Sequence, residues 1–298
     1  MNTIQGTVIN TIILFSISVS APAFSQENAD NKETNRRSIS VGVGIPSYSL
    51  PVQGQIGLGI GTYPEYEGSD HYAATALPLI NIRKPGVYFL KGGSINTNDG
   101  LASAGLTLLH FSYSEESNRR MQLAIGPLLR AYNGRDESDS NVLNGLGDID
   151  QNIGIGGFME FSAGSWMANI TVSPQDVGND KDGLLATFDI AYSTPVSDSL
   201  KISTGLVTSW GDDDYMQGYF GVTDTQAARS GLSRFDSKAG FKDVGIQIKA
   251  SYVITSRWVL EGQVGYWRLL NDAADSPIVK GEGSADQVRG LVGLSYKF

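Results

Sequence analysis

The feature that most constrains the fold of this chain is a repeated alternation of apolar with small or polar residues. In the stretch LLATFDIAYS, every second residue is apolar: Leu184, Ala186, Phe188, Ile190 and Tyr192. Successive side chains of a β-strand point to opposite faces, so this spacing predicts a strand with one apolar face. Comparable stripes occupy residues 56–60, 121–125, 200–210, 246–254, 258–266 and 292–298. The chain is therefore expected to consist mainly of β-strands.

Soluble antiparallel sheets and membrane β-barrels both produce such stripes. Charged residues make up 18% of the chain, below the roughly 25% of a typical soluble domain. No segment beyond the N-terminal region approaches about 18 consecutive apolar residues, so the pattern excludes membrane-spanning helices. We therefore expect a barrel with an apolar face toward lipid and a polar face toward a lumen. The candidate lumen-lining residues lie opposite the stripes: Asp189, Lys201, Lys249 and Glu261.

The breaks between stripes alternate in length, as they do in outer-membrane barrels with short periplasmic turns and longer outer loops. Short turns are expected near residues 84–86, 115–119, 163–165, 195–199 and 255–257. Longer loops are expected at residues 63–70, 133–150, 174–183, 211–243 and 271–286, with a shorter one at 96–100. These breaks predict an all-β, antiparallel transmembrane β-barrel of about 12 strands. An even strand number places both termini on the same side, the periplasmic one.

Aromatic residues are expected to form girdles at both ends of the strands. The loop-end candidates are Tyr63, Tyr132, Trp210 and Trp267, and the turn-end candidates are Phe161, Trp166, Tyr192, Trp258 and Phe298. The chain ends on an apolar stripe with Tyr296 and Phe298. This ending resembles the C-terminal signal that the barrel assembly machinery reads, so the last strand is expected to close the barrel.

The N-terminal region divides into two expected segments before the barrel at residues 51–298. Residues 1–25 are mostly apolar from Ile9 to Val19 and then small, which predicts a secretory signal cleaved after Ala23 or after Ser25. Residues 26–50 form a polar periplasmic leader that is expected to be a disordered tail. Its charged residues are candidate contacts for a periplasmic partner, among them Glu33, Arg36 and Arg37.

Charge and composition exclude several functions. A net charge of −9 without an extended basic cluster argues against nucleic-acid binding. The chain has no cysteine and only two histidines, His71 and His110, which leaves little for a metal centre. Nothing in the sequence brings these histidines together with the acidic run at 212–214, so we expect no catalytic site, no cofactor and no metal. The expected surroundings are outer-membrane lipid and lipopolysaccharide.

Five loop-side motifs resemble the MipA/OmpV family of outer-membrane proteins. They are TYPEYEGSDHY (62–72), GLGDID (145–150), DDDYMQGYFGVT (212–223), SGL (230–232) and RLLNDAADSPIV (268–279). The resemblance runs from about residue 55 to the C-terminus. It implies a barrel in the outer membrane of a Gram-negative bacterium.

The resemblance also implies a non-enzymatic scaffold for enzymes that synthesise and cleave peptidoglycan, with a murein lytic transglycosylase and a penicillin-binding protein as partners. The family name carries over no catalytic residues. The alternative is a porin-like channel for small solutes, because a twelve-stranded barrel lies between sizes whose lumen is filled and sizes whose lumen holds water. The loop at 211–243 offers residues for a constriction or a solute site: Tyr215, Tyr219, Phe220, Arg229 and Arg234.

Overall fold

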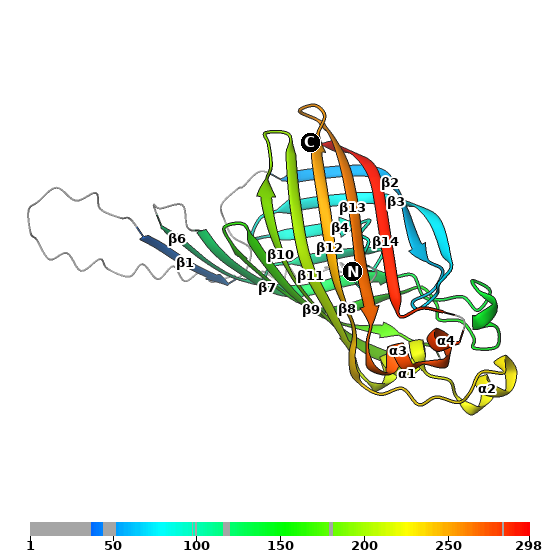
Figure 1. Ribbon diagram of the computed structural model, residues 1–298. Helices are drawn as coiled ribbons and strands as arrows, with labels where there is room; N and C mark the ends of the chain where they lie inside the picture. Colours follow the sequence, from blue (N-terminus) through cyan, green and yellow to red (C-terminus); the bar gives the residue numbers. More distant parts are fainter. Residues whose placement is uncertain are drawn as a thin grey trace, which may run out of the picture.

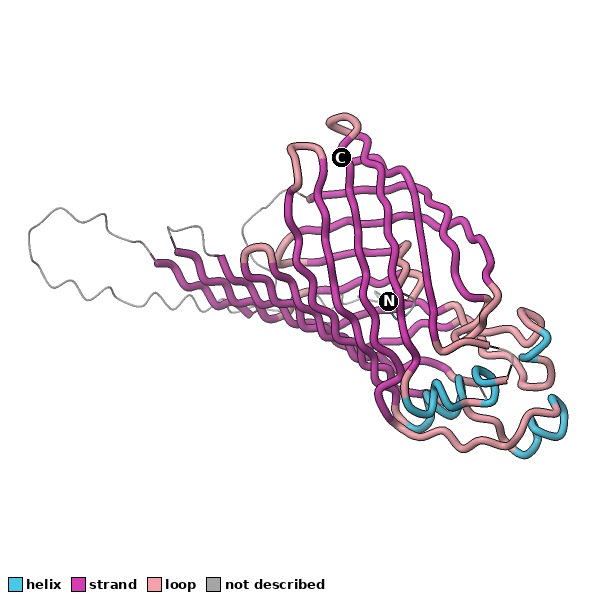
Figure 2. The backbone as a smooth tube through the Cα atoms, viewed as in Figure 1, coloured by secondary structure: helices cyan, strands magenta, loops and turns pink. Residues whose placement is uncertain are grey.

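The structure is a computed structural model that describes residues 37–43, 52–96, 98, 100–115, 120–178, 181–281 and 283–298. The expected signal segment and most of the expected leader, including Glu33 and Arg36, lie outside these residues. The described chain forms one antiparallel sheet that coils into a barrel, with short helices gathered at one end (Figures 1 and 2).

The described residues contain fourteen strands and several short helices. The strands are β1 (Arg37–Val43), β2 (Gln53–Pro64), β3 (Tyr72–Lys84), β4 (Tyr88–Gly92), β5 (Ala102–Leu106), β6 (Leu109–Glu115), β7 (Arg120–Tyr132), β8 (Asn152–Ala163), β9 (Trp166–Asp176), β10 (Asp182–Pro195), β11 (Leu200–Gly211), β12 (Gly240–Val253), β13 (Trp258–Leu269) and β14 (Asp286–Lys297). The helices are η2 (Asn141–Leu143), α1 (Asp213–Phe220), α2 (Asp224–Ser230), α3 (Asn271–Asp275) and α4 (Pro277–Lys280).

The ring of strands is closed. β14 pairs with β2, from Gly290 opposite Thr62 to Lys297 opposite Gln55, and β7 pairs with β8. β5 and β6 follow each other along the same edge of β7, so they are two halves of one wall strand. β1 pairs with β6 alone. The wall therefore has twelve strand positions, which confirms the predicted twelve-stranded antiparallel barrel.

β1 lies inside the expected leader. It runs beside β6 and β7, which extend outward from the barrel (Figure 1). β4 is only 5 residues long and ends before it reaches β6, so one edge of β6 has no neighbour from β4. β1 pairs with the backbone groups of this edge, which would otherwise stay unpaired. The expectation of a disordered tail is therefore wrong for the 7 residues of this strand.

The alternating stripes face outward, as predicted. Leu58 is 73% exposed, Leu206 55% and Val292 56%, whereas their inward neighbours include buried Val207 and Leu291. Apolar surface costs roughly 25 cal/mol per Å² in water. A continuous apolar exterior with a polar interior therefore fits a lipid environment.

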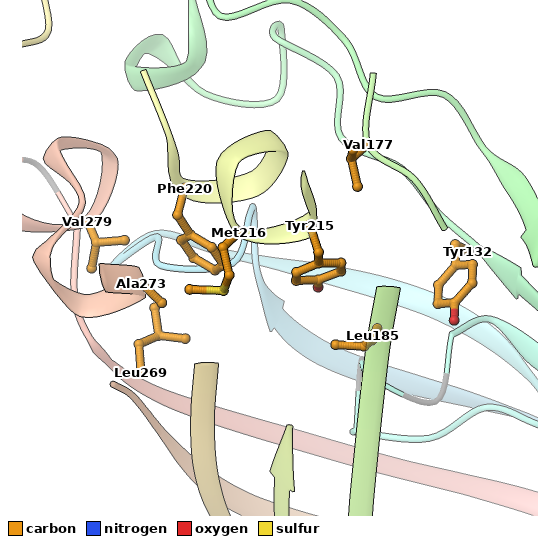
Figure 3. Close-up of a cluster of buried hydrophobic side chains, with 9 residues drawn as sticks. All are labelled: Tyr132, Val177, Leu185, Tyr215, Met216, Phe220, Leu269, Ala273 and Val279. Atoms are coloured by element: carbon orange, nitrogen blue, oxygen red, sulfur yellow. The ribbon is translucent and has the colours of Figure 1, made fainter. Parts of the chain in front are cut away.

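The helices cover the loop end of the barrel over a buried apolar cluster, which we call the cap core (Figure 3). It comprises Tyr132, Val177, Leu185, Tyr215, Met216, Phe220, Leu269, Ala273 and Val279. Asp212 begins α1 by accepting a hydrogen bond from the Tyr215 backbone N–H at 2.8 Å, and Thr223 with Gln226 forms a capping box at α2. Within the described chain, no helix is long and apolar enough to cross a membrane.

The aromatic girdles differ between the two ends. At the turn end, Trp166, Tyr192 and Trp258 are 52%, 42% and 43% exposed, as expected. At the loop end, Tyr132 and Trp267 are buried inside the barrel, so their expected place in a girdle is wrong. Alternate residues of a strand share a face, so Trp267 points inward like Glu261, and Tyr132 points inward like Arg130. Both aromatic side chains therefore pack in the lumen.

Candidate functional site

The loop between β4 and β5 folds into the lumen. We call its described residues, 93–96, 98, 100 and 101, the plug segment. Gly93 and Gly100 near its ends have φ of 74° and 69°, a left-handed region that favours glycine. A Cβ at Gly100 would lie 2.3 Å from the backbone oxygen of Ala131. The two glycines therefore let the chain turn inward and back within a short span.

Ile95 anchors the plug segment in an apolar cluster. Its side chain is fully buried and packs with Leu79, Trp267 and Leu291, which come from β3, β13 and β14. Its backbone N–H donates to Oε1 of Gln263 at 3.4 Å. The loop thus reaches strands that are separated from β4 around the ring.

Asn98 joins the plug segment to β12 and β7. Its Nδ2 donates to Oδ2 of Asp243 at 3.0 Å, and its Oδ1 accepts from Nζ of Lys242 at 2.8 Å. Its backbone oxygen accepts from Nη1 of Arg130 at 2.9 Å. Asn98 is only 3% exposed, so these contacts replace the water that a surface amide would bind.

A β-bulge allows Lys242 and Asp243 to enter the lumen together. β11 and β12 pair in regular register up to Ser209 opposite Asp243, and then Trp210 lies opposite Phe241. Lys242 is therefore the extra residue, which breaks the alternation of the two faces. Its fully buried Nζ contacts a carboxylate oxygen of Glu67 and lies 2.9 Å from Oδ2 of Asp243.

Arg289 joins Glu67, Lys242 and Asp243, and we call these four residues the lumen ion network. The guanidinium of Arg289 is 3.9 Å from Oε1 of Glu67 and lies over the ring of Trp267 at 4.6 Å. It also donates to the backbone oxygen of Ile95 at 3.4 Å. The network therefore ties the plug segment, β12, β14 and the β2–β3 loop into one buried polar assembly.

The plug segment divides the lumen into two cavities. The outer cavity, of about 510 Å³, lies toward the helices, and the inner cavity is about 350 Å³. Gly93, Ser94 and Gly100 line both. Lys91, which lines the inner cavity, lies 3.8 Å from Glu160 of β8, and Arg83 of β3 holds the same carboxylate by two hydrogen bonds of 2.8 and 2.6 Å.

Five tyrosines line the outer cavity: Tyr63, Tyr66, Tyr132, Tyr215 and Tyr219. Tyr215 and Tyr219 are stacked, with ring centroids 4.8 Å apart. Burial raises the pKa of both Tyr215 and Tyr219 above the usual value of 10.0, so both stay neutral at physiological pH. Arg135 and Arg289 also line this cavity, and both are buried.

The lumen residues that the sequence singled out lie near the inner cavity. Asp189, Lys249 and Glu261 line it, and Asp189 accepts a hydrogen bond from Nδ2 of Asn169 at 2.9 Å. Lys201 shares the inward parity of Ser203 but is exposed at the turn end and does not line either cavity.

The structure places the other candidates as follows. The backbone of Arg37 pairs with Glu115 at the end of β1. Tyr296 accepts a hydrogen bond from Nη1 of Arg257 at 2.9 Å. The Phe298 backbone N–H donates to the Gly54 oxygen at 3.0 Å, in line with a last strand that closes the barrel.

The acidic run and the histidines do not meet. Asp212 caps α1, Asp213 accepts from the Ala239 backbone N–H at 2.8 Å, and Asp214 pairs with Lys181 at 3.1 Å. His71 is exposed beside Asp70, whereas His110 lies in β6 against Gly42 of β1. The three aspartates therefore hold loop segments in place, and neither histidine is among their contacts.

Only part of the loop at 211–243 contributes to the lumen. Tyr215 and Tyr219 line the outer cavity and Phe220 is buried in the cap core. Arg229 is exposed, and Arg234 is exposed and paired with Asp236 at 3.0 Å. Neither arginine lines the outer or the inner cavity, because α2 carries this part of the loop outward (Figure 1).

The residues that divide the lumen escaped the sequence analysis: Glu67, Asn98, Arg130, Lys242, Asp243 and Arg289. Two signals could have pointed to them. Gly93 and Gly100 bracket the plug segment, and the adjacent charges Lys242-Asp243 interrupt an alternating strand.

Known proteins resemble the chain over most of its length. A family model described as MltA-interacting protein MipA matches residues 56–298. The MltA-interacting proteins of Escherichia coli (strain K12) and Shigella flexneri are each 23% identical over 256 residues, 82% of this chain and 89% of each relative. A proposed outer-membrane protein of E. coli, YiaT, is 23% identical over 41% of this chain and 48% of its own length. Among solved structures, outer-membrane OmpT of Vibrio cholerae has a TM-score of 0.36 at 9% identity, covering 87% of this chain and 98% of that one.

Proposed function

The chain belongs to the MltA-interacting protein MipA family and is an outer-membrane β-barrel, and we propose that it is a non-enzymatic scaffold for enzymes that cleave and synthesise peptidoglycan. The resemblance expected from the five loop motifs is confirmed by the family match. Two relatives are named MltA-interacting proteins, which supports a protein partner for this chain, and the family resemblance implies that this partner is a murein lytic transglycosylase. A penicillin-binding protein is the second partner in this proposal.

The divided lumen is the observation that carries this proposal. On its way through the lumen a solute meets the plug segment, which is held by Ile95 in its cluster and by the contacts of Asn98 with Lys242, Asp243 and Arg130. Each buried hydrogen bond to a charged group contributes about 1.5–3 kcal/mol. A lumen obstructed in this way favours a function at the surface of the barrel over free diffusion through it.

We propose the turn end as the partner-binding side, facing the periplasm. β1 and the first part of β7 extend beyond the wall there (Figure 1). Arg37 lies at the outer end of β1, opposite Glu115. We propose the charged residues Glu33, Arg36 and Arg37 as the contacts for the partner.

The test is crosslinking in intact cells, followed by purification of the barrel and mass spectrometry. The test variant carries Glu33→Gln, Arg36→Gln and Arg37→Gln. The control variant carries Lys181→Gln, Arg229→Gln and Arg234→Gln, exposed charges at the loop end. We expect a lytic transglycosylase with the wild type and the control, and several-fold less with the test variant. Equal recovery from all three would refute the proposed interface, and no murein enzyme with any of them would refute the scaffold.

A small-solute channel is the second candidate. It is favoured by the position of the outer and inner cavities, which lie on either side of the plug segment and share its residues as lining. Movement of the plug segment would join them. In that case the inner cavity would carry the selectivity, and Lys249→Gln or Glu261→Gln would change the ion selectivity of reconstituted barrels. A barrel without conductance, for the wild type and for variants with a displaced plug, would exclude this role.

A further inference from the structure

The outer cavity is bordered by more buried cations than buried acids. Arg135 and Arg289, which line the cavity, are 8% and 2% exposed, and Lys242, which shares Glu67 with Arg289 behind the lining, is 0% exposed. Among the described residues, the acids that contact these three are Glu67 and Asp243. Lys242 contacts both acids, and Arg289 reaches Glu67 only at 3.9 Å. One positive charge is therefore left without a buried counterion.

Arg135 carries most of this surplus. Its Nη1 donates to the backbone oxygen of Tyr219 at 3.0 Å, a neutral partner. Its Nε is buried and has no hydrogen-bond partner in the described part of the chain, and the same is true of Nε of Arg289. A buried charge without a partner is costly, so such groups normally pair with an ion or a ligand.

The acids at the mouth of the cavity do not remove the surplus. Asp139 and Asp148 lie near Arg135, and Glu65 lines the cavity, but all three are exposed. Asp139 and Asp148 already accept backbone hydrogen bonds from Asp136 and Glu137. Exposed charges are screened by water and salt, so they compensate a buried guanidinium only weakly.

Four of the five tyrosines that line the cavity have a hydrogen-bond partner for their hydroxyl group. Tyr66 donates to the Ile278 backbone oxygen and Tyr63 to the Ser94 backbone oxygen, at 3.0 and 3.2 Å. The hydroxyls of Tyr132 and Tyr219 bond to Ser173 and Gln175. A guest would therefore meet aromatic surface along its sides and guanidinium groups at its polar end.

We propose that the outer cavity binds a small organic carboxylate with an aromatic or otherwise flat apolar body. Its volume of about 510 Å³ falls within the roughly 300–1,000 Å³ of small-molecule sites. The carboxylate supplies the counterion for Arg135 or Arg289, which bind such groups bidentately, and the body stacks on the tyrosines. The exposed Glu65, Asn133 and Asp139 among the lining residues place the entrance at the loop end. This ligand site is additional to the proposed scaffold.

The test is calorimetric titration of the purified full-length barrel in lipid nanodiscs with 2-naphthoate and, separately, with its neutral analogue 2-naphthamide. Both probes have the same apolar body, so their difference isolates the charge. We expect the acid to bind at least about tenfold more tightly than the amide. Equal affinities, or no binding of the acid up to millimolar concentration, would overturn the proposal without any variant.

Variants locate the site. Arg135→Gln should weaken naphthoate binding at least about tenfold while leaving naphthamide binding unchanged. Arg234→Gln is the matched control, because Arg234 is an exposed loop-end arginine that pairs with Asp236. It should leave both affinities unchanged. Unaltered naphthoate affinity in both Arg135→Gln and Arg289→Gln would show that the acid binds elsewhere.

Discussion

Lys242 is fully buried between the carboxylates of Glu67 and Asp243, where a β-bulge turns it inward. The contribution of a buried lysine to the stability of the fold depends on its partners. A buried ion pair contributes little relative to apolar packing, but loss of one partner leaves an uncompensated charge. The lumen ion network is therefore more sensitive to single substitutions than to paired ones.

Lys242→Met should lower the free energy of unfolding by about 3–5 kcal/mol, because it leaves Glu67 and Asp243 buried without their cation. Urea titration of barrels folded in lipid vesicles, followed by tryptophan fluorescence, measures this change. Lys201→Met is the control at an exposed inward position and should change stability by less than about 0.5 kcal/mol. Adding Asp243→Asn to Lys242→Met should recover part of the loss, and an equal or larger loss would contradict this account.

At the scale of single elements, the plug segment depends on its two left-handed glycines. Gly100→Ala introduces a Cβ 2.3 Å from the Ala131 backbone oxygen at a φ of 69°, so the segment must shift out of place. We expect the variant to conduct ions in planar bilayers more than the wild type does. Gly262→Ala is the control, since a Cβ at Gly262 meets open space. If Gly100→Ala and Gly262→Ala leave conductance equally low, the plug segment is not what closes the lumen.

The last strand makes a second prediction at this scale. Phe298 donates its backbone N–H to Gly54 at the seam between β14 and β2, and its ring is 57% exposed at the turn end. Deletion of Phe298 should reduce the amount of folded barrel in the outer membrane several-fold, because both the seam and the assembly signal lose their end. Immunoblots of outer-membrane fractions measure this. Phe298→Trp keeps a terminal aromatic and should assemble normally, whereas wild-type levels after deletion would count against the closing-strand argument.

The sequence predicted elements well where one face meets lipid. β10, β11, β13 and β14 alternate strictly, and β12 does so after its bulge at Lys242, so the stripe positions followed from parity. The turns and the strand number followed from the breaks between the stripes. Parity also places Trp267 on the inward face with Glu261, whereas its distance from the strand end alone suggests a girdle position. The plug segment could not be predicted in this way. Its buried contacts are made with β7, β12, β13 and β14, and no local pattern encodes contacts over such sequence separations.

At the scale of the whole molecule, the two ends of the barrel differ in kind. The loop end carries the helices, the cap core and the outer cavity, whereas the turn end carries short turns, an aromatic rim and the extension with β1 (Figures 1 and 2). The proposed scaffold needs the turn end in the periplasm, and the proposed carboxylate site opens at the opposite end. The scaffold proposal therefore rests on the orientation in the membrane, and that orientation also decides which side the carboxylate site faces.

This orientation can be tested directly, because the chain has no native cysteine. Ala228→Cys introduces a thiol on exposed α2 at the loop end, and Ser256→Cys introduces one in the exposed turn between β12 and β13 at the other end. A membrane-impermeant maleimide added to intact cells should label Ala228→Cys and not Ser256→Cys. Permeabilising the outer membrane should then make both thiols reactive, which controls for accessibility. The reverse pattern would place the loop end in the periplasm, and the partner surface would then have to be sought among the helices and loop motifs.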